Sequence, residues 1–299
     1  MAFERVPELY AAPNERIELL EKIKDMPSID LNARQLCDLE LLMNGGFTPL
    51  KGFLSEADYL SVLEDMRLAD GSLWPMPITL DVPETFAQGL TLGQDIALRD
   101  QEGVILATMT VTDNWTPDKA HEAKQVFGAD DSTHPAVNYL HQQAGAVYLG
   151  GPVIGIQQPV HYDFRGRRDT PNELRAYFRK LGWRKVVAFQ TRNPLHRAHQ
   201  ELTFRAAKEA QANLLIHPVV GMTKPGDIDH PGGETQRLGQ GQAAVDHHRQ
   251  RAQILRGGGH AHEPPDQGQP QQHPIPAIPQ RWRAVDGHDH RDNKRQGDQ

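Results

Sequence analysis

Hydrophobic residues recur at intervals of three and four along the first part of the chain, which is the spacing of an amphipathic helix. Such stretches predict helices over residues 15–26, 33–43 and 56–66. In the second stretch Leu36, Leu39 and Leu42 form one apolar stripe. Gly45 and Gly46 then accept the left-handed backbone that commonly ends a helix, so this boundary is sharply predicted.

After residue 74 the pattern changes to short apolar runs separated by polar turns. These runs predict strands over residues 78–82, 95–98, 104–112 and 146–149. The polar segment 100–103 predicts a hairpin connection between the second and third strands. Helices followed by strands in this order favour an α+β domain built on a small sheet.

Beyond residue 171 helices and strands alternate. A helix is predicted over residues 172–181, a strand from Lys185, a helix over 195–210 and a strand over 213–220. The continuous apolar run 186–189 is typical of a strand buried on both faces of a parallel sheet. Strand, helix and strand make one right-handed parallel unit, the seed of a doubly wound, Rossmann-like nucleotide-binding sheet.

The polar segment 159–171 is bracketed by prolines and is typical of a domain boundary. We expect a first domain at residues 1–165, a partial second domain at 166–230 and a tail at 231–299. The three arginines of this segment are interpreted as exposed linker residues, with a place in a substrate cleft as the alternative. They are Arg165, Arg167 and Arg168.

A short polar turn follows the apolar run and carries the main chemical signal. Pro194 suits the first turn of a helix, so free backbone N–H groups and the positive helix end should face this turn. Such a site binds anions, most often phosphate. His196 and His199 are three apart and should share one face that points at the anion. The alternatives are a zinc site, disfavoured because zinc pairs on a helix are usually four apart, and two surface histidines without a ligand.

The composition of the 299 residues narrows the classes of protein. The net charge is −7, which argues against nucleic-acid binding because phosphate contacts need clustered Lys and Arg. No amino-terminal signal peptide and no apolar run long enough to cross a membrane is visible, so a cytoplasmic protein is expected. Cys37 is the only cysteine, and we expect it to be a buried helix residue rather than a redox group.

The last part of the chain is depleted in hydrophobic residues. Residues 231–299 contain only eight Leu, Ile, Val, Met, Phe, Trp and Tyr in 69 positions, which is too few to offset the entropy of ordering. We expect this tail to be disordered. Its histidines are irregularly spaced, so a metal-binding tail is the less favoured interpretation.

Three segments resemble signatures of the ATP sulfurylase (sulfate adenylyltransferase) family. Residues 190–202, QTRNPLHRAHQEL, are similar to its active-site signature. Residues 221–230, GMTKPGDIDH, resemble its next block, and residues 34–54, RQLCDLELLMNGGFTPLKGFL, resemble its amino-terminal signature. The resemblance covers residues 1–230. It implies a PUA-like α+β domain followed by a truncated, Rossmann-like nucleotidyltransferase domain, an α/β chain overall.

The resemblance also implies roles for individual residues. Catalytic residues would be Thr191, Arg192, Asn193, His196 and His199. The sulfate contacts would be Gln190 and Arg192, with Lys224 approaching the phosphates. ATP would be bound by Gln190 together with the five catalytic residues. Asp227 and Asp229 are open to two interpretations, a water-mediated contact with Mg²⁺ or turn capping.

The implied reaction joins ATP and sulfate to give adenosine 5′-phosphosulfate and pyrophosphate. The resemblance implies Mg²⁺ bound with ATP, no metal held by a protein cage, and a homo-oligomer in the intact family. RNA binding, which the PUA-like label suggests, is disfavoured by the acidic composition. A kinase activity on the product is not predicted, because no GxxxxGK[ST] motif occurs.

The sequence departs from the family pattern after His230, where an arginine-containing helix and a GRDH-type nucleotide loop would follow. We hypothesise that residues 231–299 are translated in an altered reading frame, or replaced otherwise. Turnover of this chain is therefore expected to be very low. The alternatives are an enzyme that adenylylates a cofactor precursor, disfavoured by Gln190 and Arg192, and a non-catalytic anion-binding or assembly fragment.

Overall fold

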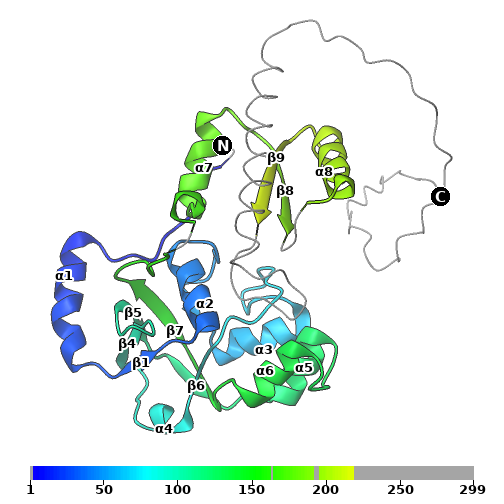
Figure 1. Cartoon of the computed structure of the whole chain (residues 1–299). Coiled ribbons are helices and arrows are strands. Elements are labelled where there is room, and N and C mark those ends of the chain that lie inside the picture. Colours follow the sequence, from blue (N-terminus) through cyan, green and yellow to red (C-terminus); the bar gives the residue numbers. More distant parts are fainter. Residues whose placement is uncertain (1–2, 163, 192–194, 219–299) are drawn as a thin grey trace, which may run out of the picture. The chain divides into compact units, whose positions relative to one another are not determined.

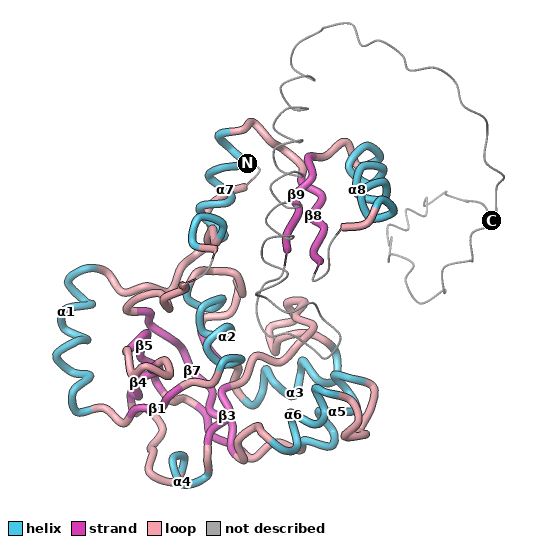
Figure 2. Tube along the Cα trace, viewed as in Figure 1, coloured by secondary structure: helices cyan, strands magenta, loops and turns pink. Residues whose placement is uncertain are grey.

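The computed structural model describes residues 3–162, 164–191 and 195–218 (Figure 1). Up to residue 155 the chain forms a mixed sheet with helices around it (Figure 2). The helices of this part are α1 (Pro13–Lys22), α2 (Ala33–Met43), α3 (Glu56–Asp65), α4 (Glu84–Ala87), α5 (Lys119–Phe127) and α6 (Pro135–Gln142), with a 3₁₀ turn, η1 (Ile23–Asp25). The strands are β1 (Ser28–Asp30), β2 (Gly52–Phe53), β3 (Leu80–Val82), β4 (Asp95–Arg99), β5 (Ile105–Thr110), β6 (Asp113–Trp115) and β7 (Val147–Gly155).

β7 is the central strand of this sheet. The order is β1-β4-β5-β7-β2, and β3 and β6 also pair with β7. All pairs except β1 with β4 are antiparallel. Gly52 of β2 lies so close to Gly151 of β7 that a Cβ atom at Gly52 would overlap the Gly151 carbonyl oxygen. Glycine is therefore required at this approach of two backbones.

Helix α2 has the bounds that the sequence predicts. Asn32 accepts a hydrogen bond from the Gln35 N–H, and the Gln35 side chain accepts one from the Asn32 N–H, so the first turn carries a capping box. Leu39 and Leu42 are buried, as the apolar stripe predicts. Cys37 lies on the opposite face of the helix and is exposed, so the prediction that it is buried was wrong.

The strand predictions hold, with revisions of length. The four predicted strands are β3, β4, β5 and β7, and the segment 100–103 connects β4 and β5 as an antiparallel hairpin. β7 continues to Gly155. The prediction ended at residue 149 because the glycines and proline at residues 150–152 interrupt the apolar pattern, although they do not interrupt the strand. β1, β2 and β6 are two or three residues long and had no pattern of their own.

The remaining elements are η2 (Arg165–Arg167), α7 (Pro171–Lys180), β8 (Val186–Thr191), α8 (Arg197–Glu209) and β9 (Asn213–Pro218). β8 and β9 pair in parallel, which confirms the predicted strand, helix and strand unit. Three details differ from prediction. β8 includes Gln190 and Thr191, α8 begins three residues after Pro194, and none of residues 186–189 is fully buried.

Helix α7 holds the start of the chain. The Asn172 side chain accepts a hydrogen bond from the Val6 N–H at 2.9 Å and donates one to the Val6 carbonyl oxygen at 3.0 Å. Arg175 and Arg179 donate to the carbonyl oxygens of Glu4 and Phe3. The backbone of residues 3–6 is thus bonded by side chains of one helix.

No helix in the part of the chain that the structure describes is long and apolar enough to cross a membrane. The three linker arginines are exposed, in agreement with the interpretation that they belong to a linker.

Candidate active site

The candidate site lies at the carboxyl edge of the parallel β8–β9 pair. Gln190 and Thr191 end β8, and His217 and Pro218 stand opposite them in register at the end of β9. Ligands of open α/β sheets bind outside the carboxyl ends of the strands. The edge therefore carries an amide, a hydroxyl and an imidazole where a ligand is expected.

Side chains alternate between the two faces of these strands. The Phe189 ring contacts the His199 ring of α8, with centroids 5.8 Å apart, so Phe189 faces α8. Leu214 pairs with Val187, is buried, and belongs to the same face. Gln190 and His217 consequently lie on the opposite face of the sheet, and both are exposed.

His196 and His199 are brought together at the start of α8. His196 is the N-cap residue with an extended backbone, and His199 is the third residue of the helix. Their ring centroids are 5.6 Å apart, with 39° between the ring planes. The His199 Nδ1 atom lies 3.3 Å from the His196 N–H and accepts from it. His199 thereby caps a backbone donor of the first turn, and its Nε2 atom is left to meet a ligand.

The helix N-terminus itself is placed for anion chemistry. α8 has thirteen residues and starts at the carboxyl end of β8, so its first N–H groups and the positive end of its dipole meet the polar edge. No acidic residue stands in its first turn to satisfy these groups. The local electrostatics of the edge favour a bound anion.

Several predicted site residues lie outside the described residues. They are Arg192, Asn193, Lys224, Asp227 and Asp229. The structure therefore places Gln190, Thr191, His196 and His199. Their roles stay predictions. His217 was not singled out from the sequence, and the signal that finds it is the register of β9 against Gln190.

A metal centre is not indicated in the described ranges, where no group of three or more His, Cys, Asp and Glu side chains is placed to hold a metal ion. The two histidines of α8 contact each other and Phe189. Zinc coordination by this pair would need further ligands.

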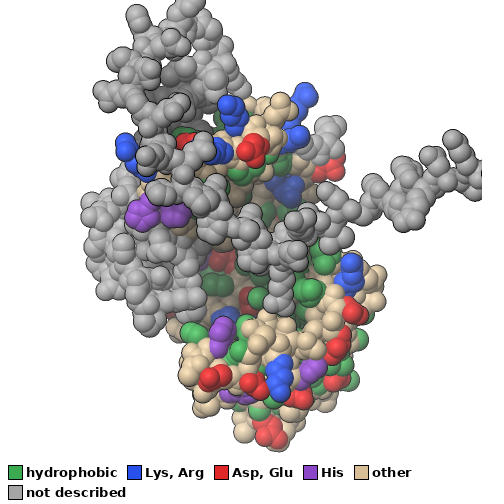
Figure 3. All heavy atoms as spheres, turned by 90° about the vertical axis from the view of Figure 1, so that its right-hand side faces the viewer, with side chains coloured by type: hydrophobic (Ala, Val, Ile, Leu, Met, Phe, Trp, Pro, Cys, Tyr) green, Lys and Arg blue, Asp and Glu red, His purple; other side chains and the backbone are tan. Residues whose placement is uncertain are grey.

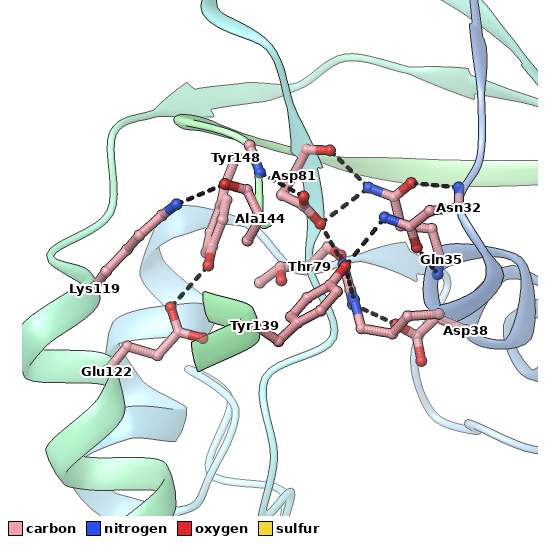
Figure 4. Close-up of polar contacts among 12 residues, drawn as sticks. Asn32, Gln35, Asp38, Thr79, Asp81, Lys119, Glu122, Tyr139, Ala144 and Tyr148 are labelled. Carbon is pink, nitrogen blue, oxygen red and sulfur yellow. Dashed lines mark hydrogen bonds and ion pairs between the residues drawn. The ribbon is translucent and has the colours of Figure 1, made fainter. Parts of the chain in front are cut away.

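A second concentration of polar side chains lies inside the amino-terminal domain (Figure 4). Arg34 of α2 is its hub, donating through Nη1 to Asp38 at 2.6 Å and through Nη2 to Asp81 of β3. Its Nε atom donates to the Tyr139 hydroxyl at 3.2 Å. Asp81 also accepts from the Gln35 side chain at 2.9 Å and is only 4% exposed. Burial raises the pKa of Asp38 to about 6, against the lowering effect of Arg34.

The same interior holds a buried carboxyl group between two tyrosines. The Tyr59 and Tyr148 hydroxyls each donate to Glu122 of α5 at 2.9 Å. Burial raises the pKa of Glu122, and the two tyrosine hydrogen bonds oppose that rise. Burial together with the Glu122 charge raises the pKa values of both tyrosines.

This buried network (Arg34, Gln35, Asp38, Asp81, Tyr139, with Glu122, Tyr59 and Tyr148 beside it) connects α2, α3, β3, α5, α6 and β7. Three of its members, Arg34, Gln35 and Asp38, come from the amino-terminal signature. Their donors and acceptors bond to other side chains and to backbone, so this signature stabilises the domain. On the face that Figure 3 displays, both basic and acidic side chains are visible among the described residues.

Two family models match the chain. The PUA-like domain model matches residues 2–158. The ATP-sulfurylase model matches residues 165–251. The two matched ranges meet within the polar segment that contains the three linker arginines.

Curated relatives match the same part of the chain. A sulfate adenylyltransferase of Mycosarcoma maydis is 56% identical over 216 residues, which are 71% of this chain and 38% of the relative. That of Phaeosphaeria nodorum is 58% identical over 218 residues, 72% of this chain and 38% of the relative. The sulfate adenylyltransferase of Schizosaccharomyces pombe is 53% identical over 217 residues, which are 72% of this chain and 44% of the relative. The matched region thus spans less than half the length of these relatives.

Solved structures with a related fold include an APS kinase. A hexameric APS kinase from Thiobacillus denitrificans aligns with a TM-score of 0.60 and 36% sequence identity, covering 74% of this chain and 40% of that chain. The alignment agrees with the mixed α/β architecture found here.

Proposed function

We propose that this chain, which belongs to the PUA-like domain family over residues 2–158 and matches the ATP-sulfurylase family model over residues 165–251, functions in sulfate adenylyl transfer. A sulfate oxygen attacks the α-phosphorus of ATP. The bond from that phosphorus to the oxygen bridging to the β-phosphorus breaks, and pyrophosphate leaves with the electron pair. The protein is a transferase of sulfate assimilation in this proposal.

The observation that carries the proposal is the placement of His196 and His199 at the N-terminus of α8, directly after the carboxyl end of β8. Imidazole N–H groups and a helix dipole at this point would stabilise negative charge on the leaving pyrophosphate. Both substrates are polyanions, so charge neutralisation and alignment are the main work of such a site.

The remaining roles follow from the resemblance. Gln190 and Arg192 contact sulfate, Thr191 and Asn193 orient phosphate oxygens, and Lys224 approaches the phosphates as a point charge. Mg²⁺ bound with ATP would neutralise phosphate charge, and no residue of the described part is assigned to bind this ion. We further propose a cytoplasmic homo-oligomer, in line with the hexameric state named for the solved APS kinase.

The test is a sulfate-dependent pyrophosphate-release assay with ATP and Mg²⁺. Arg192→Ala should lower any such signal by about 100-fold or more, because a charge clamp on the reacting anions is lost. Arg184→Ala is the matched control, since it removes the same charge from an exposed position outside the site. Equal loss in both variants, or release that does not depend on sulfate, would refute the proposal.

A second candidate is a non-catalytic fragment that binds anions or assembles with complete subunits. It is favoured by one observation, that the matched region spans only 38% of the first relatives. Specific sulfate binding without pyrophosphate release, in a chain that co-purifies with a complete relative, would favour this candidate over the first.

A further inference from the structure

We propose that His217 is a further contact for the acceptor oxyanion, beside Gln190 on the face of the β8–β9 sheet opposite α8. This proposal rests on the adenylyl-transfer function proposed above. It separates the two anions of the reaction between the two faces of one sheet edge.

The register of the strands places the two side chains together. Gln190 and His217 are direct partners in a parallel pair, so both side chains project from the same face. Neighbouring strands lie about 4.8 Å apart. An amide and an imidazole at that spacing can both reach one tetrahedral anion, each through an N–H donor.

The side chains on the two faces of β9 differ in their exposure to solvent. Leu214 is 8% exposed and faces α8, whereas His217 is exposed. Gln190 and Ala188 are exposed on the same face as His217. The small Ala188 side chain, one step back along that face, leaves the pair accessible from solvent.

The chemistry of the reaction calls for such a division. In an in-line displacement the attacking oxygen and the leaving oxygen stand on opposite sides of the phosphorus. His196 and His199 lie at the start of α8, which packs against both strands, and suit the leaving polyphosphate. A second contact on the other face keeps the acceptor anion on the attacking side, which limits repulsion between the two anions.

The experiment follows histidine Hε1–Cε1 resonances of the full chain by NMR during titration with sodium sulfate. Sodium chloride at matched ionic strength is the reference titration. His217→Asn, which keeps an amide donor, and His217→Phe, which keeps only the ring volume, assign the resonance. His141→Asn is the matched control at an exposed histidine on α6.

We expect sulfate, and not chloride, to move the His217 resonance with a saturating curve. Gln190→Ala should weaken sulfate binding by about tenfold, the loss expected for one hydrogen bond to a charged group. His217→Phe should weaken it by a similar factor and His217→Asn by less, while His141→Asn leaves it unchanged. In the pyrophosphate-release assay the same variants should raise the KM for sulfate and not the KM for ATP.

The outcomes separate this inference from the function on which it rests. If sulfate moves the His196 and His199 resonances but not that of His217, the acceptor sits on the α8 face and the inference is wrong, whatever the activity. The inference is also overturned if sulfate and chloride act alike on His217. A saturable sulfate response at His217 in a chain without pyrophosphate release supports the contact and removes the catalytic function.

Discussion

Polar side chains inside the PUA-like domain bond to one another, whereas those at the carboxyl edge of β8 and β9 stand exposed. Asp81 accepts hydrogen bonds from Arg34, Gln35 and the Gly145 N–H, and it is almost fully buried. Gln190 and His217 are exposed side by side on neighbouring strands. Arg34 and Gln35 lie in the amino-terminal signature and Gln190 lies in the active-site signature, yet the polar groups of the first region are bonded within the protein and those of the second are exposed.

The difference separates two reasons for placing polar groups in a sequence. A buried group that is satisfied by its own chain contributes to the uniqueness and stability of the fold, and removing its partner is costly. An exposed group on a strand end contributes little to stability and is available to a ligand. Substitutions in the two regions should therefore have opposite profiles, with stability lost in the first and ligand response lost in the second.

The largest effect is expected for Arg34→Ala. The substitution leaves the buried Asp81 and the half-buried Asp38 without their cation, so the free energy of unfolding should fall by about 3 kcal/mol or more. Urea denaturation followed by circular dichroism measures this change. Arg184→Ala is the matched control and should leave the midpoint nearly unchanged. A loss of stability as small as that of the control would show that the buried network is not what stabilises this domain.

A smaller effect, dependent on pH, is expected for Glu122→Gln. The pKa of Glu122 is raised in the folded state, so ionisation of this carboxyl favours the unfolded chain. The stability that the neutral carboxyl provides is therefore lost as the pH rises above 4.5, the ordinary pKa of a glutamate. The advantage of the wild type over the Gln variant should therefore shrink from acidic to neutral pH. Denaturation midpoints measured across this range provide the test.

Glu18→Gln, at an exposed position of α1, is the control for that series and should show no comparable trend. A difference between wild type and Glu122→Gln that grows with pH would contradict the assigned direction. Tyr59 and Tyr148 donate to the same carboxylate oxygen, and these two hydrogen bonds, together with the charges of Arg34 and Lys119, oppose the rise in the Glu122 pKa.

The smallest effect on stability is expected for Gln190→Ala. The side chain is exposed on a strand end, so the free energy of unfolding should change by less than about 0.5 kcal/mol. The same variant should nevertheless weaken the sulfate response described above. A large loss of stability would remove the contrast between the two regions, and thermal unfolding in sulfate-free buffer would detect it.

Much of the fold could be predicted because its signals are local. The bounds of α2 were predicted from an apolar stripe and a glycine pair, and the structure adds the capping residue Asn32, all within fifteen positions. The β8, α8 and β9 unit follows from two apolar runs around an amphipathic segment. The bonding partners of Arg34 could not be predicted in this way, because Asp81 and Tyr139 lie 47 and 105 residues away in the sequence.

The candidate site was predicted in part for the same reason. His196 and His199 are near neighbours, so helical spacing alone brings them together. The start of α8 was placed too early because proline at a first helical turn is a preference and not a rule, and His196 took the capping position. His217 becomes visible only through its pairing with Gln190, since no spacing rule relates two strands separated by a helix.

The docking of residues 3–6 on α7 has a consequence for how the protein is made and handled. Val6 bonds to Asn172, 166 positions later, so the backbone of Val6 gains these two partners only after α7 has been synthesised. The ring of Phe3 packs against the ring of Phe178 of α7, so a purification tag fused ahead of Phe3 would begin next to this contact. Expression with the tag at the other end should therefore give the better yield of folded material.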